Sequence, residues 1–293
     1  MTGPLVTGTP GALVVVGTPI GNLGDLSPRA STALAEATVV LCEDTRRTRK
    51  LFSAIGVKTP RLVRLDRTNE ADMSARVVAT LAGGERVVLV SDAGMPAVSD
   101  PGAEVVRAAA AAGFAISVIP GPSAAVAAVA ISGIPGDGFT FAGFLARKGT
   151  ARREALGRIA SSPLTTVIYE AGNRVKATTL DLEEACGAGR VYVWARELTK
   201  VHEQVWRGTL GEAVQAFERA EVDERGEWVL LVGPNGKEGE PEAGKEQVEH
   251  LLKRAVATGA SRRSAVDEVA AATGVKRRQV YEIALNLGDG VHR

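Results

Sequence analysis

The loop at residues 91–102, SDAGMPAVSDPG, combines two carboxylates, two glycines and two prolines directly after the apolar run VVLV. Glycine and proline at this density exclude a helix, and glycine lets the backbone adopt a positive φ or approach a ligand closely. A second loop, residues 42–48, places Glu43 and Asp44 just before two arginines. Carboxylates can accept a proton from a reacting group, and arginines can stabilise developing negative charge. The sequence therefore predicts a functional site that is built from loops.

Two further loops have a similar composition. Residues 17–22 read GTPIGN, and residues 120–125 read PGPSAA. The glycines at positions 17, 21 and 24 do not have the GxGxxG spacing, and no GK[ST] follows them. The loops therefore do not match a dinucleotide fingerprint or a Walker phosphate cradle. Small residues with exposed backbone amides suit a compact zwitterionic ligand, such as an amino acid or its adenosyl derivative.

The elements that must position these loops alternate between strands and helices. Continuous apolar runs predict strands that are buried on both faces, and each loop begins where such a run ends. Ser27 and Pro28 predict a helix start, Gly56 a helix end, and Asp100 the N-cap of a helix over 102–113. This alternation predicts a parallel α/β sheet, in which ligands bind outside the carboxyl ends of the strands. The predicted strands are 12–17, 38–44, 61–66, 86–91 and 114–120.

The second half of the chain predicts another α/β domain, with a mixed sheet. Its expected strands are 163–170, 190–199, 203–210 and 226–233, and its expected helices are 150–160, 174–186 and 210–220. A polar linker over 234–246 leads to three short helical patterns with helix-turn-helix character. From residue 251 onward there are eight Lys and Arg against four Asp and Glu, a local net charge of +4. The predicted domains are 1–121, 122–235 and 247–293.

Composition narrows the classes of protein. A net charge of +1 over 293 residues does not favour any particular class of partner, so any nucleic-acid surface must be a local patch. The N-terminus lacks a basic signal-peptide region, and no apolar run approaches the ~20 residues that span a bilayer. Cys42 and Cys186 are isolated and the three histidines are scattered, so no metal site is expected. We expect a reducing, cytoplasmic environment and no membrane association.

Five motifs, in this order, resemble one known family. They are GTPIGNLGDLSPRA, CEDTRRT, SDAGMPAVSDPG, IPGPSA, and ARELTKVHE followed by RGTL. Together they resemble the ribosomal RNA small subunit methyltransferase I family over roughly residues 12–233, and the basic tail fits the family's C-terminal helical domain. The resemblance implies the tetrapyrrole methylase fold and S-adenosylmethionine-dependent methylation of a cytidine 2′-hydroxyl in 16S rRNA. In one departure, the family's YE-x-P-H-R reads YEAGNR here, with Gly172 and Asn173.

The resemblance also implies which residues approach the cofactor. In tetrapyrrole methylases the Gly-rich loop lies under the methionine part of S-adenosylmethionine, the PGPSA turn lies nearby, and the second domain closes over the adenosine. The residues expected to bind the cofactor are Gly94, Met95, Pro96, Val98, Ser99, Ser123, Ala124, Tyr169 and Leu198. Members of this superfamily are commonly dimeric, so we also expect a homodimer.

The reaction constrains the catalytic residues. A ribose hydroxyl is a poor nucleophile, so it needs alignment with the methyl group and preferably a base or a cation near the oxygen. The candidate bases are Glu43, Asp44 and Asp92, and Lys200 or Arg46 is the candidate stabiliser of the alkoxide. The residues expected to contact the RNA within the small ribosomal subunit are Arg46, Arg47, Arg174, Arg262, Arg263, Lys276, Arg277 and Arg278.

Other interpretations remain open on the sequence alone. The same fold is compatible with a methyltransferase that acts on a tetrapyrrole, or on a protein residue as in diphthine synthesis. A non-catalytic RNA-binding module for ribosome assembly is a third hypothesis. At the level of residues, Gly94 and Gly102 fit simple turns, Glu43–Asp44 fits a helix start, Ser123 fits a helix cap, and RRTRK (46–50) fits a solvated helix face.

Overall fold

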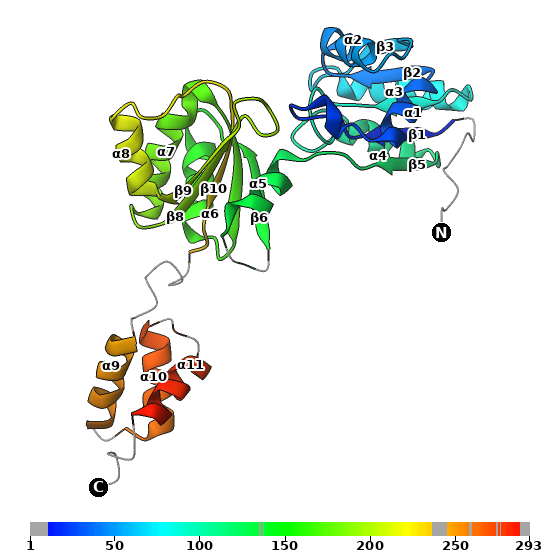
Figure 1. Cartoon of the computed structure of the whole chain (residues 1–293). Coiled ribbons are helices and arrows are strands. Elements are labelled where there is room, and N and C mark those ends of the chain that lie inside the picture. Colours follow the sequence, from blue (N-terminus) through cyan, green and yellow to red (C-terminus); the bar gives the residue numbers. More distant parts are fainter. Residues whose placement is uncertain are drawn as a thin grey trace. The chain divides into compact units, whose positions relative to one another are not determined.

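The computed structural model describes residues 11–134, 136, 138–235, 245–257, 260–273, 275 and 277–287, with backbone only for 245–247 and 271 (Figure 1). By internal contacts the chain divides into two compact units. The first contains the residues up to 133 together with 195–205 and 226–229, and the second contains the remainder. The domain bounds 1–121, 122–235 and 247–293 stay a prediction from the sequence.

The first unit contains the predicted parallel sheet. Its strand order is β3-β2-β4-β1-β5, and each neighbouring pair is parallel. The strands are β1 (Leu13–Val16), β2 (Val39–Cys42), β3 (Arg61–Arg64), β4 (Val87–Leu89) and β5 (Ile116–Ile119). The helices are η1 (Leu23–Asp25), α1 (Pro28–Ala35), α2 (Thr45–Ala54), α3 (Glu70–Ala82), α4 (Ala103–Ala111) and α5 (Ala124–Ser132).

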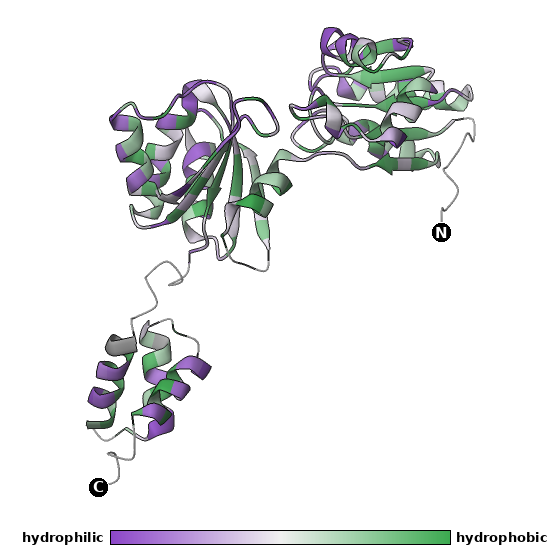
Figure 2. Cartoon of the chain, viewed as in Figure 1, coloured by the Kyte–Doolittle hydropathy of each residue, from purple (hydrophilic) through white to green (hydrophobic). Residues whose placement is uncertain are grey.

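Both faces of this sheet are buried, which explains the continuous apolar runs. Leu13 and Val15 of β1 pack in a core with residues of α3 and α4, whereas Val14 and Val16 pack in a second core with residues of α1 and α2. Alternate side chains of a strand point to opposite faces, so a central strand covered on both sides carries no polar residue. Figure 2 shows this apolar composition of the strands.

The helix ends test the capping predictions. Ser27 caps α1 with Pro28 in its first turn, and Gly56, at φ +68°, follows the C-cap of α2. The prediction for Asp100 was wrong, because the N-cap of α4 is Gly102, which has no side chain to accept the free N–H groups. Glu70 replaces that cap from α3: its Oε1 accepts the Gly102 N–H at 2.8 Å and the Glu104 N–H at 2.7 Å.

The second unit contains a five-stranded mixed sheet with the order β6-β7-β10-β8-β9. The sequence missed β6, an edge strand whose burial is irregular and whose sequence FTFAGF contains a glycine. The strands are β6 (Phe139–Phe144), β7 (Thr165–Ala171), β8 (Val191–Arg196), β9 (Gln204–Thr209) and β10 (Glu227–Val232). The helices are α6 (Thr150–Ser161), α7 (Gly172–Cys186) and α8 (Leu210–Glu218).

The tail forms three helices, as predicted. They are α9 (Lys245–Ala257), α10 (Arg262–Thr273) and α11 (Arg277–Asn286). Their apolar faces pack into a core of their own, which includes Val248, Leu252, Val266 and Val280. Among the residues that the structure describes, no helix is long and apolar enough to cross a membrane.

Candidate functional site

Three of the predicted loops meet at the carboxyl edge of the first sheet. Thr18, after β1, and Gly94, after β4, exchange two backbone hydrogen bonds, with N···O distances of 2.9 and 3.1 Å. Gly17 lies so close to Gly121 that a Cβ on Gly17 would come within 2.6 Å of the Gly121 Cα. Only glycine permits this approach, so the loops after β1, β4 and β5 form one connected wall.

The loop at 91–102 holds an unusual backbone conformation. Gly94 and Gly102 have positive φ, as do the non-glycine residues Ala97 (φ +63°) and Ser99 (φ +67°). A non-glycine residue in the left-handed region costs about 1–3 kcal/mol, and such residues concentrate at functional sites. Arg67 supports the loop by donating to the Ser99 carbonyl at 2.6 Å. The loop is therefore more than a turn between β4 and α4.

The predicted cofactor residues of this loop have different environments. Met95 packs partly against the core, and its Sδ accepts the Gly121 N–H at 3.4 Å, so its side chain joins two loops. Gly94 is buried, and a Cβ there would lie 3.4 Å from both Ile20 Cγ2 and the Pro122 carbonyl oxygen. Pro96 is buried, whereas Val98 is exposed. In the third loop, Ser123 is the N-cap of α5 and Ala124 its first residue.

A group of carboxylates lies at the neighbouring strand ends. Glu43 follows β2 and Asp92 follows β4, and these strands are adjacent. Burial, and then the nearby Glu43 carboxylate, raise the pKa of Asp100 to about 6, although a hydrogen bond with Ser91 lowers it. Burial, and then Asp92, also raise the pKa of Glu43. Sequence reasoning missed Asp100 because it treated this residue as a helix cap.

Asp44 and Asp92 have structural partners. Asp44 is the N-cap of α2, where it accepts the Arg46 N–H at 2.7 Å. Hydrogen bonds from the Arg46 side chain and backbone lower the pKa of Asp44 to about 2. Asp92 Oδ1 accepts the Asp44 N–H at 3.0 Å, and its Oδ2 lies 3.6 Å from Arg47 Nε. A carboxylate with so low a pKa is a weak base, so Asp44 fits the helix-start interpretation.

The ELTK segment, residues 197–200, is a second conformationally unusual loop and belongs to the same compact unit. Glu197 (φ +52°) and Thr199 (φ +64°) are both left-handed. Leu198 is buried, and Thr199 Oγ1 is a buried oxygen without a hydrogen-bond partner among the described residues. A Cβ on Gly21 would come within 2.8 Å of that oxygen. The ELTK segment therefore packs directly on the loop at 17–22.

Lys200 lies in an ion-pair network. Its Nζ lies 2.8 Å from Glu197 Oε1 and 2.9 Å from Glu227 Oε2. Burial by itself lowers the pKa of Lys200, but the hydrogen bonds to these two carboxylates raise it overall. The ammonium group is therefore neutralised by the protein, and it clamps the ELTK segment to the start of β10.

Two predicted site residues of the second unit also have protein partners. The Tyr169 ring packs edge-on against Phe141 and Phe144, with centroid distances of 4.8 and 5.7 Å. Arg174 Nε lies 3.3 Å from Oε1 of the buried Glu170, and its Nη2 donates to the Leu145 carbonyl at 2.9 Å.

One of the two departures from the family motif, Gly172, has a local steric reason, and nothing in the structure explains Asn173. A Cβ at Gly172 would lie 1.9 Å from the Glu224 carbonyl oxygen, so a larger residue does not fit there.

The basic side chains of the tail are partly neutralised. Arg277 Nε lies 2.5 Å from Asp267 Oδ1, and Arg278 Nε lies 3.2 Å from Glu282 Oε1. Arg263 is exposed and Arg262 is half-buried at the start of α10. Lys276 lies outside the described residues.

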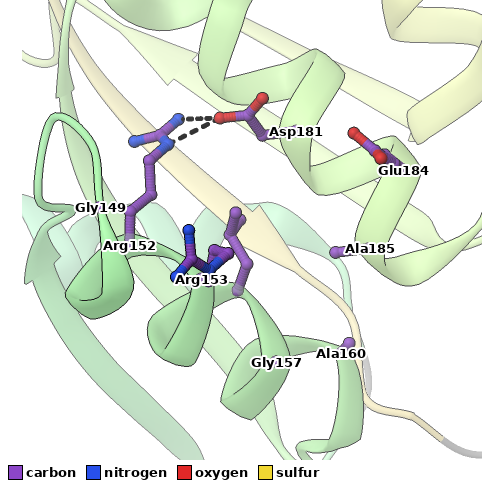
Figure 3. A pocket seen from close by; sticks show the side chains of 9 residues that line it. Gly149, Arg152, Arg153, Gly157, Ala160, Asp181, Glu184 and Ala185 are labelled. Atoms are coloured by element: carbon purple, nitrogen blue, oxygen red, sulfur yellow. Dashed lines mark hydrogen bonds and ion pairs between the residues drawn. The ribbon is translucent and has the colours of Figure 1, made fainter.

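A wide cavity lies between α6 and α7 of the second unit (Figure 3). It has a volume of about 560 Å³, and small residues such as Ala160 and Ala185 form part of its lining. Arg152 at its rim pairs with Asp181. None of the predicted site residues lines this cavity, so we assign the site to the loops.

The loops fit a compact zwitterionic ligand with a small body. Glycines at 17, 94 and 121 let the loops pack closely against one another, and the Thr199 hydroxyl is a buried polar group without a partner among the described residues. Among the described residues, no group of three or more His, Cys, Asp or Glu side chains is arranged to hold a metal ion. The carboxylates at Glu43 and Asp100 lie at the same sheet edge and can accept a proton.

Comparison with family models gives two matches. Residues 12–214 match the tetrapyrrole (corrin/porphyrin) methylases, and residues 242–288 match the RsmI C-terminal HTH domain. Proteins named ribosomal RNA small subunit methyltransferase I are similar over nearly the whole chain. The one from Xylella fastidiosa (strain Temecula1) is 42% identical over 93% of this chain and 98% of its own length. The one from Synechocystis is 39% identical over 96% of this chain and 100% of its own length.

Solved structures share the fold over about three quarters of this chain. The methyltransferase CobJ has a TM-score of 0.57 and 25% identity over 76% of this chain and 94% of its own. A uroporphyrin-III C-methyltransferase from Thermus thermophilus, in complex with S-adenosylhomocysteine, has a TM-score of 0.54 and 19% identity over 76% of this chain and 96% of its own. Diphthine synthase has a TM-score of 0.59 and 16% identity over 76% of this chain and 89% of its own. The last two show the fold alone.

Proposed function

The chain belongs to the ribosomal RNA small subunit methyltransferase I family, and we propose that it transfers the methyl group of S-adenosylmethionine to the ribose 2′-oxygen of a cytidine in 16S rRNA. The observation that carries the proposal is the order of groups along one sheet edge. Glycine-rich loops follow β1, β4 and β5, and carboxylates follow β2 and β4. A cofactor-binding wall and a proton acceptor therefore lie side by side, as methyl transfer to a hydroxyl requires.

The cofactor is held by the loops at 17–22, 91–102 and 120–125 together with the ELTK segment. Gly94 and Gly121 let the backbones of these loops pack closely enough to form one wall, and the Thr199 hydroxyl provides a hydrogen-bonding group. When bound, S-adenosylmethionine supplies an electrophilic methyl group on a positively charged sulfur. Lys200 positions the ELTK segment through Glu197 and Glu227 rather than acting on the substrate.

Asp100 would accept the proton of the 2′-hydroxyl as its oxygen bonds to the methyl carbon, while the bond from that carbon to the sulfonium sulfur breaks and the neutral thioether leaves. A base works best when its pKa lies near the working pH, and Asp100, at about 6, is closer to neutrality than Asp44, at about 2. Burial keeps the pKa of Asp100 high, and Glu43 adds to the effect because the two carboxylates repel each other when both are ionised. Arg47, beside Asp92, is exposed and available to a substrate phosphate.

The assay is methyl transfer with purified protein, labelled S-adenosylmethionine, and small ribosomal subunits from a strain that lacks the gene. We expect label in one ribose-methylated cytidine of 16S rRNA, mapped by mass spectrometry. A non-catalytic assembly module would leave the subunits unlabelled and would not bind the cofactor in calorimetry. Label in a base, a tetrapyrrole or a protein would contradict the proposal.

The proposal includes a cytoplasmic homodimer. Phe139 and Phe144 on the edge strand β6, and Val126 on α5, expose apolar side chains that a second copy can cover. The described cysteines, Cys42 and Cys186, are both unpaired, and a ribosomal substrate places the enzyme where thiols stay reduced.

A further inference from the structure

Positive charge is concentrated in one short segment of the first unit. Residues 43–67 contain eight Lys and Arg and three Asp and Glu, a net charge of +5. Because the whole chain has a net charge of +1, the other residues together have a net charge of −4. This segment follows β2 directly and contains helix α2 and the edge strand β3, so the excess charge belongs to one corner of the first unit.

Helix α2 separates its charged and apolar residues. Thr48 and Phe52 are its buried residues, and Phe52 belongs to the core beneath the helix. Arg46, Arg49 and Lys50 are exposed and lie three and four positions apart, so they share one face. This face is hydrophilic in Figure 2. We call these three residues the α2 basic face.

Helix stability does not explain the α2 basic face. Cations near a helix N-terminus oppose the helix dipole, and like charges four residues apart repel each other. Yet the first turn of α2 has no acidic residue, and Arg46 lies four positions before Lys50. Among the described residues, Arg46 pairs with Asp44, whereas Arg49 and Lys50 have no ion-pair partner. An external anion accounts for these cations better than the fold does.

We propose that the α2 basic face binds the phosphodiester backbone of the RNA next to the nucleotide that is methylated. The proposal rests on the proposed function. Helix α2 begins two residues after Glu43. An RNA strand bound to this face therefore runs past the carboxylates that, in the proposed function, accept the proton of the ribose hydroxyl. Contacts to phosphates fix the position of a nucleic acid without reading its sequence, and a flexible lysine and arginine suit that task.

The test compares two double variants with the same change of charge. R49Q/K50Q removes two cations from the α2 basic face, and R153Q/R158Q removes two exposed cations from α6 in the second unit. Binding to a 16S rRNA transcript is titrated between 50 and 300 mM salt, and S-adenosylmethionine affinity is measured by calorimetry as a check of folding.

Losing two phosphate contacts reduces the slope of log K against log salt by about 1.4–1.8, which is on the order of 30-fold in affinity near 0.1 M salt. We expect this loss for R49Q/K50Q alone, with cofactor affinity unchanged. A wild-type slope in R49Q/K50Q, or an equal loss in R153Q/R158Q, overturns the proposal. If R49Q/K50Q binds RNA as the wild type does but binds polyglutamate more weakly, the proposal is overturned and an acidic protein becomes the expected partner of this face. The readout is binding, so it is independent of whether the wild-type protein transfers a methyl group.

Discussion

Replacing Asp100 by asparagine should strongly reduce activity and stabilise the protein at the same time. The asparagine keeps the size of the side chain but cannot accept the proton of the 2′-hydroxyl. Removing a general base typically costs about 10²–10⁴-fold in rate. In the wild-type enzyme, methyl transfer should fall as the pH drops below about 6, because Asp100 becomes protonated there. The residual activity of D100N should not show this decline below pH 6.

The effect on stability follows from the direction of the pKa shift. The pKa of Asp100 rises from 3.8 to about 6 on folding, so the folded state binds this proton more tightly than the unfolded state. Asp100 therefore favours folding at low pH, and that contribution is lost as the pH rises from about 4 to about 6. A difference of about 2 in pKa corresponds to a loss of about 3 kcal/mol in the free energy of unfolding at neutral pH. Because this group is only half-buried, solvent screening reduces the loss to about 1 kcal/mol.

Asparagine has no charge, so D100N lacks the destabilisation that the ionised Asp100 carboxylate causes at neutral pH. D100N should therefore melt about 2–4 °C above the wild type at pH 7.5 and no higher than the wild type at pH 4. The control is D44A, which removes the N-cap of α2 and should lower the melting temperature at pH 7.5. Calorimetric melting curves at both pH values and methyl transfer from pH 5 to pH 8 test the argument. Wild-type activity in D100N, or a lower melting temperature at pH 7.5, would refute it.

Three further predictions concern the loops, the assembly and the tail. G94V should lose S-adenosylmethionine binding in calorimetry, whereas the control G113V, at the same φ of +79° but in open space, should keep it; equal affinities would contradict the assignment of the loop. Light scattering at micromolar concentration should give twice the monomer mass of 30.5 kDa, and a monomer would exclude the homodimer. Deleting residues 246–293 should weaken rRNA binding and flatten its salt dependence without changing cofactor affinity, because the cofactor loops remain; an unchanged slope would make the tail a packing element.

The first sheet and its loops were predictable because their signals are local. A strand covered on both faces, such as β1, needs a continuous apolar run, and the loop after it must then begin at the first Gly or Pro. The cap at Ser27 and the turn at Gly56 depend only on neighbouring residues. These features place the site at one sheet edge before any side-chain contact is known.

The roles of the charged residues were not predictable, because their partners are distant in sequence. Glu70 caps α4 from 32 residues away and thereby leaves Asp100 free of the role that its position indicated. Glu227 is 27 residues from Lys200 and turns a candidate catalytic cation into part of a clamp. The periodicity of a sequence predicts which face of a helix or strand a residue lies on. It does not predict which charged residue, distant in sequence, contacts it.

The remaining electrostatic problem is that a site rich in carboxylates must accept a polyanion. Beyond the effect of burial, Asp92 raises the pKa of Glu43, and Glu43 and Asp92 raise the pKa of Asp100. An RNA phosphate nearby would raise the pKa of Asp100 further and leave less of it ionised at neutral pH. The cations around these acids counter that effect: Arg47 lies beside Asp92, Arg67 lowers the pKa of Asp100, and α2 adds Arg49 and Lys50. The +5 charge of residues 43–67 thus has two consequences, since it attracts the RNA and keeps the proton acceptor ionised once the RNA is bound.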